Sequence, residues 1–338
     1  MKILVTGGTG YIGSHTVVEL QNSGYEVVII DNLSNSIIEV NDNIEKITGV
    51  RPEFQNIDLC DSTALAEFFK KQNDISAVIH FAAFKAVGES VNFPLRYYHN
   101  NVTGMINLLN ELVKKGIRDF VYSSSCTVYG EADKLPVTEE SPVKKAESPY
   151  GFTKQIGEQM LWDLSAVSDL RSVILRYFNP TGAHDSSLIG ELPVGIPNNL
   201  VPYITQTAIG KREMLTVNGN DYDTPDGTNI RDYIHVVDLA KAHVLALKRM
   251  LDRSSEENVE IFNLGTGRGN SVLEVITSFE KVTGLKLNYR IGTRRSGDVV
   301  SIYSDTKKAN EILGWYAERD LNDMMLTSWN WQKHIGKD

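Results

Sequence analysis

The sequence lacks several features that would indicate other classes of protein. Among its 338 residues only Cys60 and Cys126 are cysteines, too few for a disulfide framework or a cysteine metal cluster. The seven histidines show neither an HExxH motif nor another paired spacing typical of ligands, so no metal site is expected. The scarcity of cysteine favours a reducing, cytoplasmic location.

Long hydrophobic runs and an excess of positive charge are also missing. The apolar run in MKILVTGGTG is interrupted by glycine after a few residues, and no other run is long enough to cross a membrane. The formal net charge of −9 argues against a nucleic-acid partner, which normally needs a basic surface. The hydrophobic content of 41% is ordinary for a globular protein with a real core.

Short β-branched runs alternate with amphipathic segments through the first half of the chain. Strands separated by helices of this length predict an α/β fold with a parallel sheet covered on both faces, because parallel strands need crossover connections. The predicted strands are Ile3–Thr6, Glu26–Asp31, Ala77–Ala82, Phe120–Ser124 and Val173–Phe178, and the predicted helices are Ser14–Ser23, Ala64–Gln72 and Val102–Lys115.

The composition changes after about residue 179, where Pro193, Pro197 and Pro202 fall close together and glycine, aspartate and asparagine become frequent. Such a loop-rich stretch is typical of a substrate-binding region. We therefore expect a main domain over residues 1–180 and a smaller, loop-rich domain over residues 181–338. Residues 232–251 are predicted to form a strand and a helix that return to the main domain.

Glycines recur directly after the first predicted strand. In TGGTGYIG, Gly7, Gly10 and Gly13 are three residues apart and precede a predicted helix. Glycine permits a tight turn and a close approach of the backbone to a pyrophosphate, and the helix N-terminus supplies unpaired N–H donors for the anion. An ordinary glycine-rich turn is the alternative.

Two acidic residues favour the dinucleotide interpretation. The second predicted strand ends in Asp31, about 18 residues after Gly13, where a carboxylate can accept hydrogen bonds from an adenosine ribose. A carboxylate there repels a 2′-phosphate, so NAD is favoured over NADP. Asp58 follows the short run 54–57, where the adenine edge would be read.

A tyrosine and a lysine stand four residues apart in SPYGFTK. Ser148 and Pro149 suit the N-cap and first position of a helix, so Tyr150 and Lys154 are expected on one helix face. A lysine ammonium beside the phenol should lower the tyrosine pKa and make Tyr150 a base for an alcohol proton. Ser125, at the end of the strand in FVYSSSCTVYG, can hydrogen-bond the same oxygen; a serine-rich turn that caps the strand is the alternative.

These motifs resemble the extended short-chain dehydrogenase/reductase superfamily. Longer stretches, from HFAAFKAVGESV through SSSCTVYG, LRYFNPTGAH and GIPNNLVPY to GTNIRDYIHVVDLA, are similar to the UDP-glucose 4-epimerase family over residues 1 to about 310. The resemblance implies a Rossmann-type doubly wound parallel sheet with a smaller, loop-rich C-terminal substrate-binding domain. It also implies an NAD-dependent isomerase of carbohydrate metabolism.

That family's activity is the reversible C4 epimerisation of UDP-glucose and UDP-galactose through a 4-keto sugar, with transient hydride transfer to tightly bound NAD and Tyr150 as acid and base. By resemblance, Ser125, Tyr150 and Lys154 are the catalytic residues. The implied NAD ligands are Gly7, Gly10, Tyr11, Ile12, Gly13, Asp31, Asn32, Asp58, Phe81, Ala82, Lys85, Asn100, Tyr150, Lys154 and Phe178. The implied substrate ligands are Ser125, Tyr150, Asn179, Asn199, Leu200, Arg231, Arg295 and Asp298.

The residue chemistry supports this substrate set independently. Arg231 and Arg295 offer planar, always-charged donors suited to a diphosphate, although a surface salt bridge is the default role of either alone. Asp298 can accept from ribose hydroxyls or simply be solvated. His235 is expected to be structural. The family often forms homodimers through a helical face, to which residues 102–115 could contribute.

Two positions depart from the family's pattern. Asn218 stands where an aromatic residue often lies beside the uracil. Ile302 stands where family members differ in side-chain size near the sugar, which leaves open whether N-acetylated sugars are accepted.

Three other functions are compatible with the fold. A nucleotide-sugar 4,6-dehydratase needs an additional acid–base pair, but Cys126 and Thr127 occupy the matching positions. A non-catalytic NAD-binding sensor has no need for Ser125, Tyr150 and Lys154 together. A plain alcohol dehydrogenase should depend on added cofactor.

Overall fold

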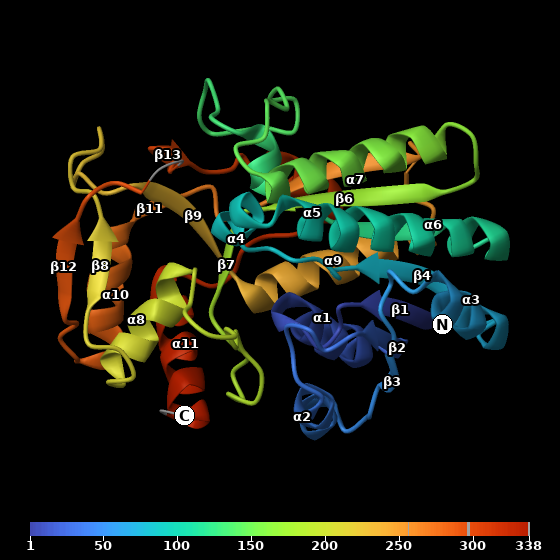
Figure 1. Cartoon of the computed structure of the whole chain (residues 1–338), viewed down its shortest axis with the longest axis horizontal. Helices are drawn as coiled ribbons and strands as arrows, with labels where there is room; N and C mark the ends of the chain where they lie inside the picture. Colours follow the sequence, from blue (N-terminus) through green and yellow to red (C-terminus); the bar gives the residue numbers. More distant parts are fainter. Residues whose placement is uncertain (256, 296–297, 337–338) are drawn as a thin grey trace.

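The computed structural model describes residues 1–255, 257–295 and 298–336. In this part of the chain, seven parallel strands form the main sheet in the order β10-β6-β5-β4-β1-β2-β3 (Figure 1). Short apolar runs become strands here because both faces of the sheet are buried. The strands are β1 (Lys2–Thr6), β2 (Glu26–Asp31), β3 (Glu53–Asn56), β4 (Ile75–His80), β5 (Asp119–Ser123), β6 (Arg171–Tyr177) and β10 (Val259–Leu264).

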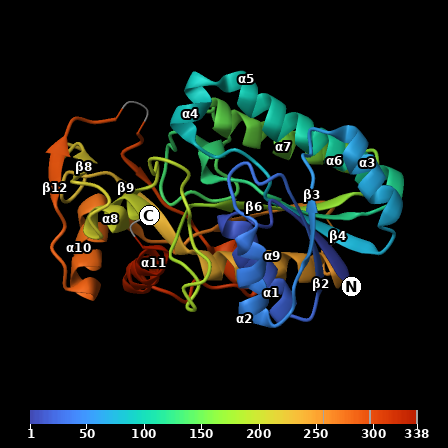
Figure 2. The same ribbon diagram turned by 60° about the horizontal axis from the view of Figure 1, so that its bottom comes forward.

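Helices cover both faces of the main sheet, as Figure 2 shows, with α1, α2 and α9 on one side and α3, α6 and α7 on the other. Alternate residues of β1 separate the two cores: Ile3 and Val5 pack toward α1 and α9, whereas Leu4 packs toward α3 and α6. The helices are α1 (Tyr11–Asn22), α2 (Glu39–Thr48), α3 (Ser62–Lys71), α4 (Val87–Asn92), α5 (Pro94–Tyr97), α6 (Gly104–Lys115), α7 (Pro149–Ser165) and α9 (Val236–Leu251). The predicted doubly wound parallel α/β fold is confirmed.

A smaller lobe lies beside the carboxyl ends of the main strands, at the left of Figure 1. Its own core joins helices to two small sheets, and Ile204, Phe279 and Met325 are fully buried there. Among the described residues, its strands are β7 (Asn179–Thr181), β9 (Ile230–His235), β11 (Gly269–Ser271) and β13 (Ser301–Ile302) in one sheet, with β8 (Leu215–Asn218) and β12 (Tyr289–Gly292) in the other. Its helices are α8 (Leu200–Ala208), α10 (Val272–Thr283) and α11 (Leu321–Ile335).

The chain passes between the two lobes more than once. Helix α9 packs against α1 and the main sheet, but the strand before it, β9, pairs with β7, β11 and β13 in the smaller lobe. Of the segment 232–251 that was expected to return to the main domain, helix α9 packs on that domain, whereas the strand belongs to the smaller lobe. The strand that completes the main sheet is β10, which pairs with β6 and was not predicted from the sequence.

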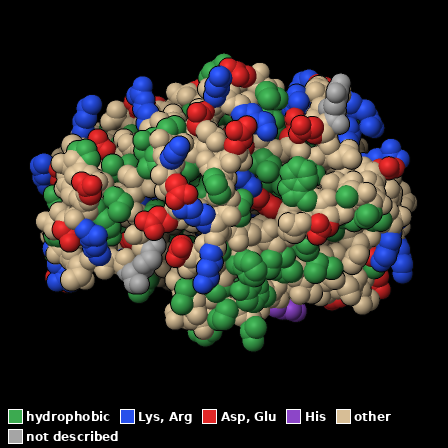
Figure 3. Space-filling model, turned by 90° about the horizontal axis from the view of Figure 1, so that it is seen from above, with side chains coloured by type: hydrophobic (Ala, Val, Ile, Leu, Met, Phe, Trp, Pro, Cys, Tyr) green, Lys and Arg blue, Asp and Glu red, His purple; other side chains and the backbone are tan. Residues whose placement is uncertain are grey.

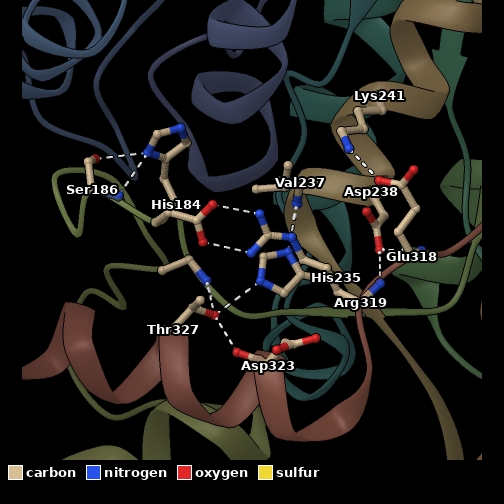
Figure 4. A network of polar contacts seen from close by, with 12 residues as sticks. His184, Ser186, His235, Val237, Asp238, Lys241, Glu318, Arg319, Asp323 and Thr327 are labelled. Atoms are coloured by element: carbon tan, nitrogen blue, oxygen red, sulfur yellow. Dashed lines mark hydrogen bonds and ion pairs between the residues drawn. The ribbon is translucent and has the colours of Figure 1, made fainter.

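His235 lies in a polar network where the lobes meet (Figure 4). Its Nδ1 accepts from the Val237 N–H at 3.1 Å at the start of α9, and its Nε2 lies 3.0 Å from the Thr327 hydroxyl of α11. Burial lowers the pKa of His235 to about 3, so the ring is neutral near pH 7. These contacts agree with the structural role expected for this residue.

No helix among the described residues is long and apolar enough to span a membrane.

Candidate active site

Two pockets share a wall where the lobes meet. The larger, about 530 Å³, is lined by the turn after β1 and is called the glycine pocket below. The smaller, about 220 Å³, is lined by Arg231 and Arg295 and is called the arginine pocket. Both lie at the carboxyl end of the main sheet, where ligands bind in open parallel sheets. Glu191, Asn198 and Asn199 line both pockets.

The turn after β1 admits no side chain at two of its glycines. Gly7 has a φ of +73°, and a Cβ on it would lie 2.7 Å from the Ala82 nitrogen. A Cβ on Gly13 would lie 2.1 Å from the Gly7 carbonyl oxygen, which shows how closely α1 packs on the turn. Helix α1 begins after Gly10 with no side-chain cap, so its first N–H groups are available to a ligand. This cradle fits a pyrophosphate.

The two predicted acidic residues stand at the far end of the glycine pocket. Asp31, the last residue of β2, accepts from the Thr9 N–H at 3.2 Å and from the Leu33 N–H at 2.9 Å. Asp58 accepts from the Asn32 amide at 3.0 Å and from the Cys60 N–H at 2.8 Å. Although burial acts to raise it, these hydrogen bonds leave the pKa of Asp58 below its usual value. An ionised carboxylate there suits ribose and adenine donors.

Helix α7 begins as predicted, with Ser148 as N-cap accepting from the Gly151 N–H at 3.1 Å and Pro149 in the first turn. It places Tyr150 and Lys154 in the wall of the glycine pocket. Both side chains are buried, at 7% and 4% exposure. The Lys154 ammonium donates to the Ser123 carbonyl at 2.6 Å and lies 6.0 Å from the centre of the Tyr150 ring.

The electrostatics of this pair differ from the expectation. Burial raises the pKa of the Tyr150 phenol, Tyr177 adds to the effect, and hydrogen bonding with Ser125 opposes it. Burial also lowers the pKa of Lys154 to about 8, although Glu158 acts to raise it. The pKa of Tyr150 is therefore raised rather than lowered as predicted, because burial has the largest effect on the phenol.

Ser125 follows β5 and is buried, and its hydroxyl acts to lower the pKa of the Tyr150 phenol. Its hydroxyl also accepts from the Thr127 N–H at 3.2 Å, so it caps the short 3₁₀ helix Cys126–Tyr129. The structure thus shows the capping role of this serine, and the effect of its hydroxyl on the pKa of Tyr150 agrees with the expected contact between the two side chains.

The arginine pocket collects charged side chains from separate segments. Arg295 forms a two-point contact with Asp298, at 3.1 Å from Nε and 2.7 Å from Nη2. Arg231, on β9, lies 3.8 Å from the same carboxylate and donates to its own neighbour, the Ile230 carbonyl, at 2.8 Å. Burial lowers the pKa of Arg231, so its guanidinium is a partly desolvated cation. Such a group favours an anionic ligand.

Most predicted ligands line the expected pocket. Those in the glycine pocket are Gly7, Gly10, Tyr11, Ile12, Gly13, Asp31, Asn32, Asp58, Phe81, Ala82, Lys85, Asn100, Tyr150 and Lys154. Those in the arginine pocket are Asn179, Asn199, Leu200, Arg231, Arg295 and Asp298. Ser125 and Phe178 are outside both described linings; Phe178 packs with Cys126 and Ile302 in a small apolar cluster.

Sequence reasoning missed several wall residues. Tyr177, next to the predicted Phe178, lines the glycine pocket and accepts from the Ser123 hydroxyl at 2.9 Å. Its position at the carboxyl end of β6 was a signal that could have found it. Glu191 and Trp331 also line this pocket, but each comes from a segment without a motif, so only the tertiary structure places them.

The model of the NAD dependent epimerase/dehydratase family matches residues 3–265 of the chain. A UDP-glucose 4-epimerase of Bacillus subtilis is 54% identical over 98% of this chain and 97% of its own length. A human UDP-glucose 4-epimerase is 50% identical over 98% of this chain and 96% of its own. The crystal structure of UDP-glucose 4-epimerase from Bifidobacterium longum in complex with NAD⁺ and UDP is 46% identical, with a TM-score of 0.94 over 99% of this chain and 98% of that one.

The chain therefore belongs to the NAD dependent epimerase/dehydratase family. The resemblance to UDP-glucose 4-epimerases that the sequence motifs indicate is confirmed by these relatives.

Proposed function

We propose that this enzyme is an isomerase that interconverts UDP-glucose and UDP-galactose by inverting carbon 4 of the sugar, with NAD as a retained cofactor. The observation that carries the proposal is the position of Tyr150 and Lys154. They lie in the wall of a dinucleotide-type pocket that shares residues with a second pocket built around two arginines. Relatives about 50% identical over almost the whole chain are UDP-glucose 4-epimerases.

The residues of the glycine pocket fit NAD. The uncapped start of α1 would hold its pyrophosphate and Asp31 its adenosine ribose. When bound, NAD supplies a positively charged nicotinamide ring that accepts a hydride from the sugar and returns it to the other face. The buried Lys154 would donate to the nicotinamide ribose from its place beside the Ser123 carbonyl.

Tyr150 would take the proton of the sugar's 4-hydroxyl as hydride leaves carbon 4, and would give it back to the 4-oxygen when the hydride returns, so it must enter the cycle as the phenolate. Burial opposes this ionisation. The positive charge of Lys154, buried on the same helix face, and that of the nicotinamide would favour it. Ser125, whose hydroxyl acts to lower the pKa of this phenol, would orient the Tyr150 hydroxyl. Arg231 and Arg295 would bind the diphosphate, and Asp298 the uridine ribose.

The structure disfavours the dehydratase alternative. Cys126 occupies the position where that chemistry needs an acid, but burial raises the pKa of its thiol to about 12. A thiol of this kind neither ionises nor exchanges a proton readily near pH 7.

We also propose that residues 1–180, with α9 and β10, form the cofactor domain and that the rest binds the UDP-sugar. A cytoplasmic location is supported by the free thiols Cys60 and Cys126. A homodimer through the α4–α7 face is supported by exposed apolar side chains, which gather toward the lower edge of the face in Figure 3. The exposed apolar side chains on and between α4 and α7 include Val91, Phe93, Leu95, Ile106, Val113, Phe152 and Trp162.

The test of the activity is turnover of UDP-galactose by purified protein to which no NAD is added. We expect UDP-glucose as the product, and deuterium placed on carbon 4 should remain in it. UDP-glucose formed only with added NAD would show that the cofactor is not retained, and a keto sugar formed together with NADH would indicate a plain dehydrogenase. Loss of the deuterium to water would exclude hydride return. The absence of turnover in protein shown to contain NAD would refute the proposal.

A further inference from the structure

Glu191 lies at the junction of the two pockets, and the mechanism above gives it no role. With Asn198 and Asn199 it lines both the glycine pocket and the arginine pocket. Its side chain is only 13% exposed. A largely buried carboxylate beside pockets that must each accept a diphosphate opposes anion binding unless it is neutralised, so its presence there requires an explanation.

A single oxygen of Glu191 joins one side chain from each lobe. Its Oε1 accepts from the Lys85 ammonium at 2.9 Å and from the Asn199 amide at 2.7 Å. Lys85 follows β4 of the main sheet and belongs to the predicted NAD ligands. Asn199 is the N-cap residue of α8 in the smaller lobe and belongs to the predicted substrate ligands.

The segment that carries Glu191 is itself fixed to the C-terminal helix. The Trp331 indole N–H donates to the Glu191 carbonyl at 2.8 Å. The preceding residue, Gly190, packs so closely that a Cβ on it would lie 2.5 Å from the Trp331 ring. Helix α11 therefore holds the Glu191 main chain in place, and the carboxylate acts from a fixed point.

Lys85 is in turn directed over the glycine turn. Its ammonium lies 5.6 Å from the centre of the Tyr11 ring, at the first residue of α1. Glu191 thus determines where this cation stands relative to the pyrophosphate cradle. At the same time it determines where the Asn199 amide stands relative to the arginine pocket.

We propose that Glu191 is a positioning residue that couples the occupancy of the two pockets. One oxygen of Glu191 holds both Lys85 and Asn199. A nucleoside diphosphate in the arginine pocket fixes Asn199 and, through Glu191, also fixes the Lys85 side chain over the dinucleotide in the glycine pocket. Bound UDP then slows the loss of NAD, and by linkage NAD strengthens the binding of UDP. This inference rests on the proposed assignment of NAD and UDP to the two pockets.

The test measures NAD loss from the purified holoprotein with and without saturating UDP, together with the Kd of UDP by calorimetry. In the unmodified protein, UDP should slow NAD loss by about fivefold or more, as is usual for coupled sites. In Glu191→Ala the UDP effect should vanish and the Kd of UDP should rise by about 10-fold, because the ion pair with Lys85 and the hydrogen bond that positions Asn199 are both lost. In Glu191→Gln the amide oxygen still accepts from Asn199, so UDP affinity should recover to within about threefold while the UDP effect on NAD stays reduced.

A matched control is Glu318→Gln, which removes the carboxylate of an ion pair with Lys241 (2.6 Å) away from both pockets. It should behave like the unmodified protein. In steady-state kinetics, Glu191→Ala should raise the KM for UDP-galactose by about 10-fold and change kcat by less than about threefold, because Tyr150 and Lys154 are untouched.

Two outcomes would overturn the coupling: UDP without effect on NAD loss in the unmodified protein, or a Glu191→Ala variant in which UDP still protects NAD. If Glu191→Ala does not fold, Lys85→Met replaces it, with the UDP effect expected to vanish. Both ligands are measured without turnover. A failure of the epimerase proposal is therefore distinguishable from a failure of this one.

Discussion

The two pockets are built from different chemistry. In the glycine pocket the cradle is main chain, formed by glycines without side chains and the uncapped N–H groups of α1. In the arginine pocket it consists of long charged side chains, with Arg231 and Arg295 facing Asp298. A binding site made of main chain loses affinity when a substitution adds side-chain atoms, whereas a binding site made of side chains loses affinity when a substitution removes them. Enlarging substitutions should therefore weaken binding in the glycine pocket, and truncating substitutions should weaken binding in the arginine pocket.

The largest effect should come from Tyr150, which lies in the wall of the glycine pocket but belongs to neither cradle. Replacement of Tyr150 by Phe removes only the proton-carrying hydroxyl, so turnover should fall by about 10²–10⁴-fold, the usual contribution of general acid–base catalysis. Both NAD content and UDP affinity should stay near normal. Activity close to that of the unmodified protein would show that another group carries the proton.

Gly13→Ala should break the main-chain cradle. The added Cβ would lie 2.1 Å from the Gly7 carbonyl oxygen, so the turn or α1 must shift. We expect NAD affinity to fall on the order of 100-fold, as for other small displacements at a preorganised site, measured as NAD retained after gel filtration. Gly88→Ala is the matched control, because a Cβ there meets no atom within 4 Å. Full NAD content in Gly13→Ala would contradict the role of the turn.

Arg231→Met should weaken UDP binding in the arginine pocket and leave NAD binding unchanged. Charge-assisted hydrogen bonds contribute about 1.5–3 kcal/mol, so the Kd of UDP should rise roughly 10- to 150-fold by calorimetry. The exposed Arg290 of β12 lies outside both described pockets, and Arg290→Met serves as the control. An unchanged Kd would remove Arg231 from the proposed UDP ligands.

Low pH should reduce the folding stability of the main domain in particular. Burial lowers the pKa of His15 and His80 to about 3 and that of His243 to about 4, and these residues lie on α1, β4 and α9. On unfolding they regain a pKa near 6.5 and take up protons, so stability is fully present above about pH 6.5 and is lost as the pH falls toward 4. We expect a loss of about 2 kcal/mol or more between pH 6.5 and pH 5, measured by denaturant unfolding. A flat profile over this range would contradict the buried neutral state of these rings.

The smallest effect is a gain on the substrate side. Asn218 is exposed at the end of β8 and lines the arginine pocket. Because base–aromatic stacking contributes about 1–3 kcal/mol, Asn218→Phe should strengthen UDP binding by about fivefold if the uracil lies beside it. In this case a larger side chain should increase the affinity of a pocket for its ligand, whereas in Gly13→Ala it should decrease that affinity. Weaker binding would place the uracil elsewhere.

The same difference in chemistry explains what the sequence could predict. The cofactor side follows local rules: a glycine turn after a strand, an acid at the next strand end, and a serine–proline helix start before Tyr150. Each was placed correctly because each depends on neighbours in the chain. Strand β10 and Glu191 were missed because their positions depend on partners far away, β6 for the strand and Lys85 and Trp331 for the carboxylate. The pKa of Tyr150 was misjudged because burial cannot be read from the spacing of two residues.

The placement of β10 has a consequence for anyone who wishes to divide this molecule. The seventh strand of the main sheet is made only after the chain has travelled through the whole of β7 to β9. A fragment that stops at residue 180 would leave β6, with its fully buried Ile174 and Leu175, as a bare sheet edge. Neither lobe can be spliced out or exchanged for a foreign module as one contiguous piece. New specificities must be grafted through point changes and loop insertions rather than by shuffling.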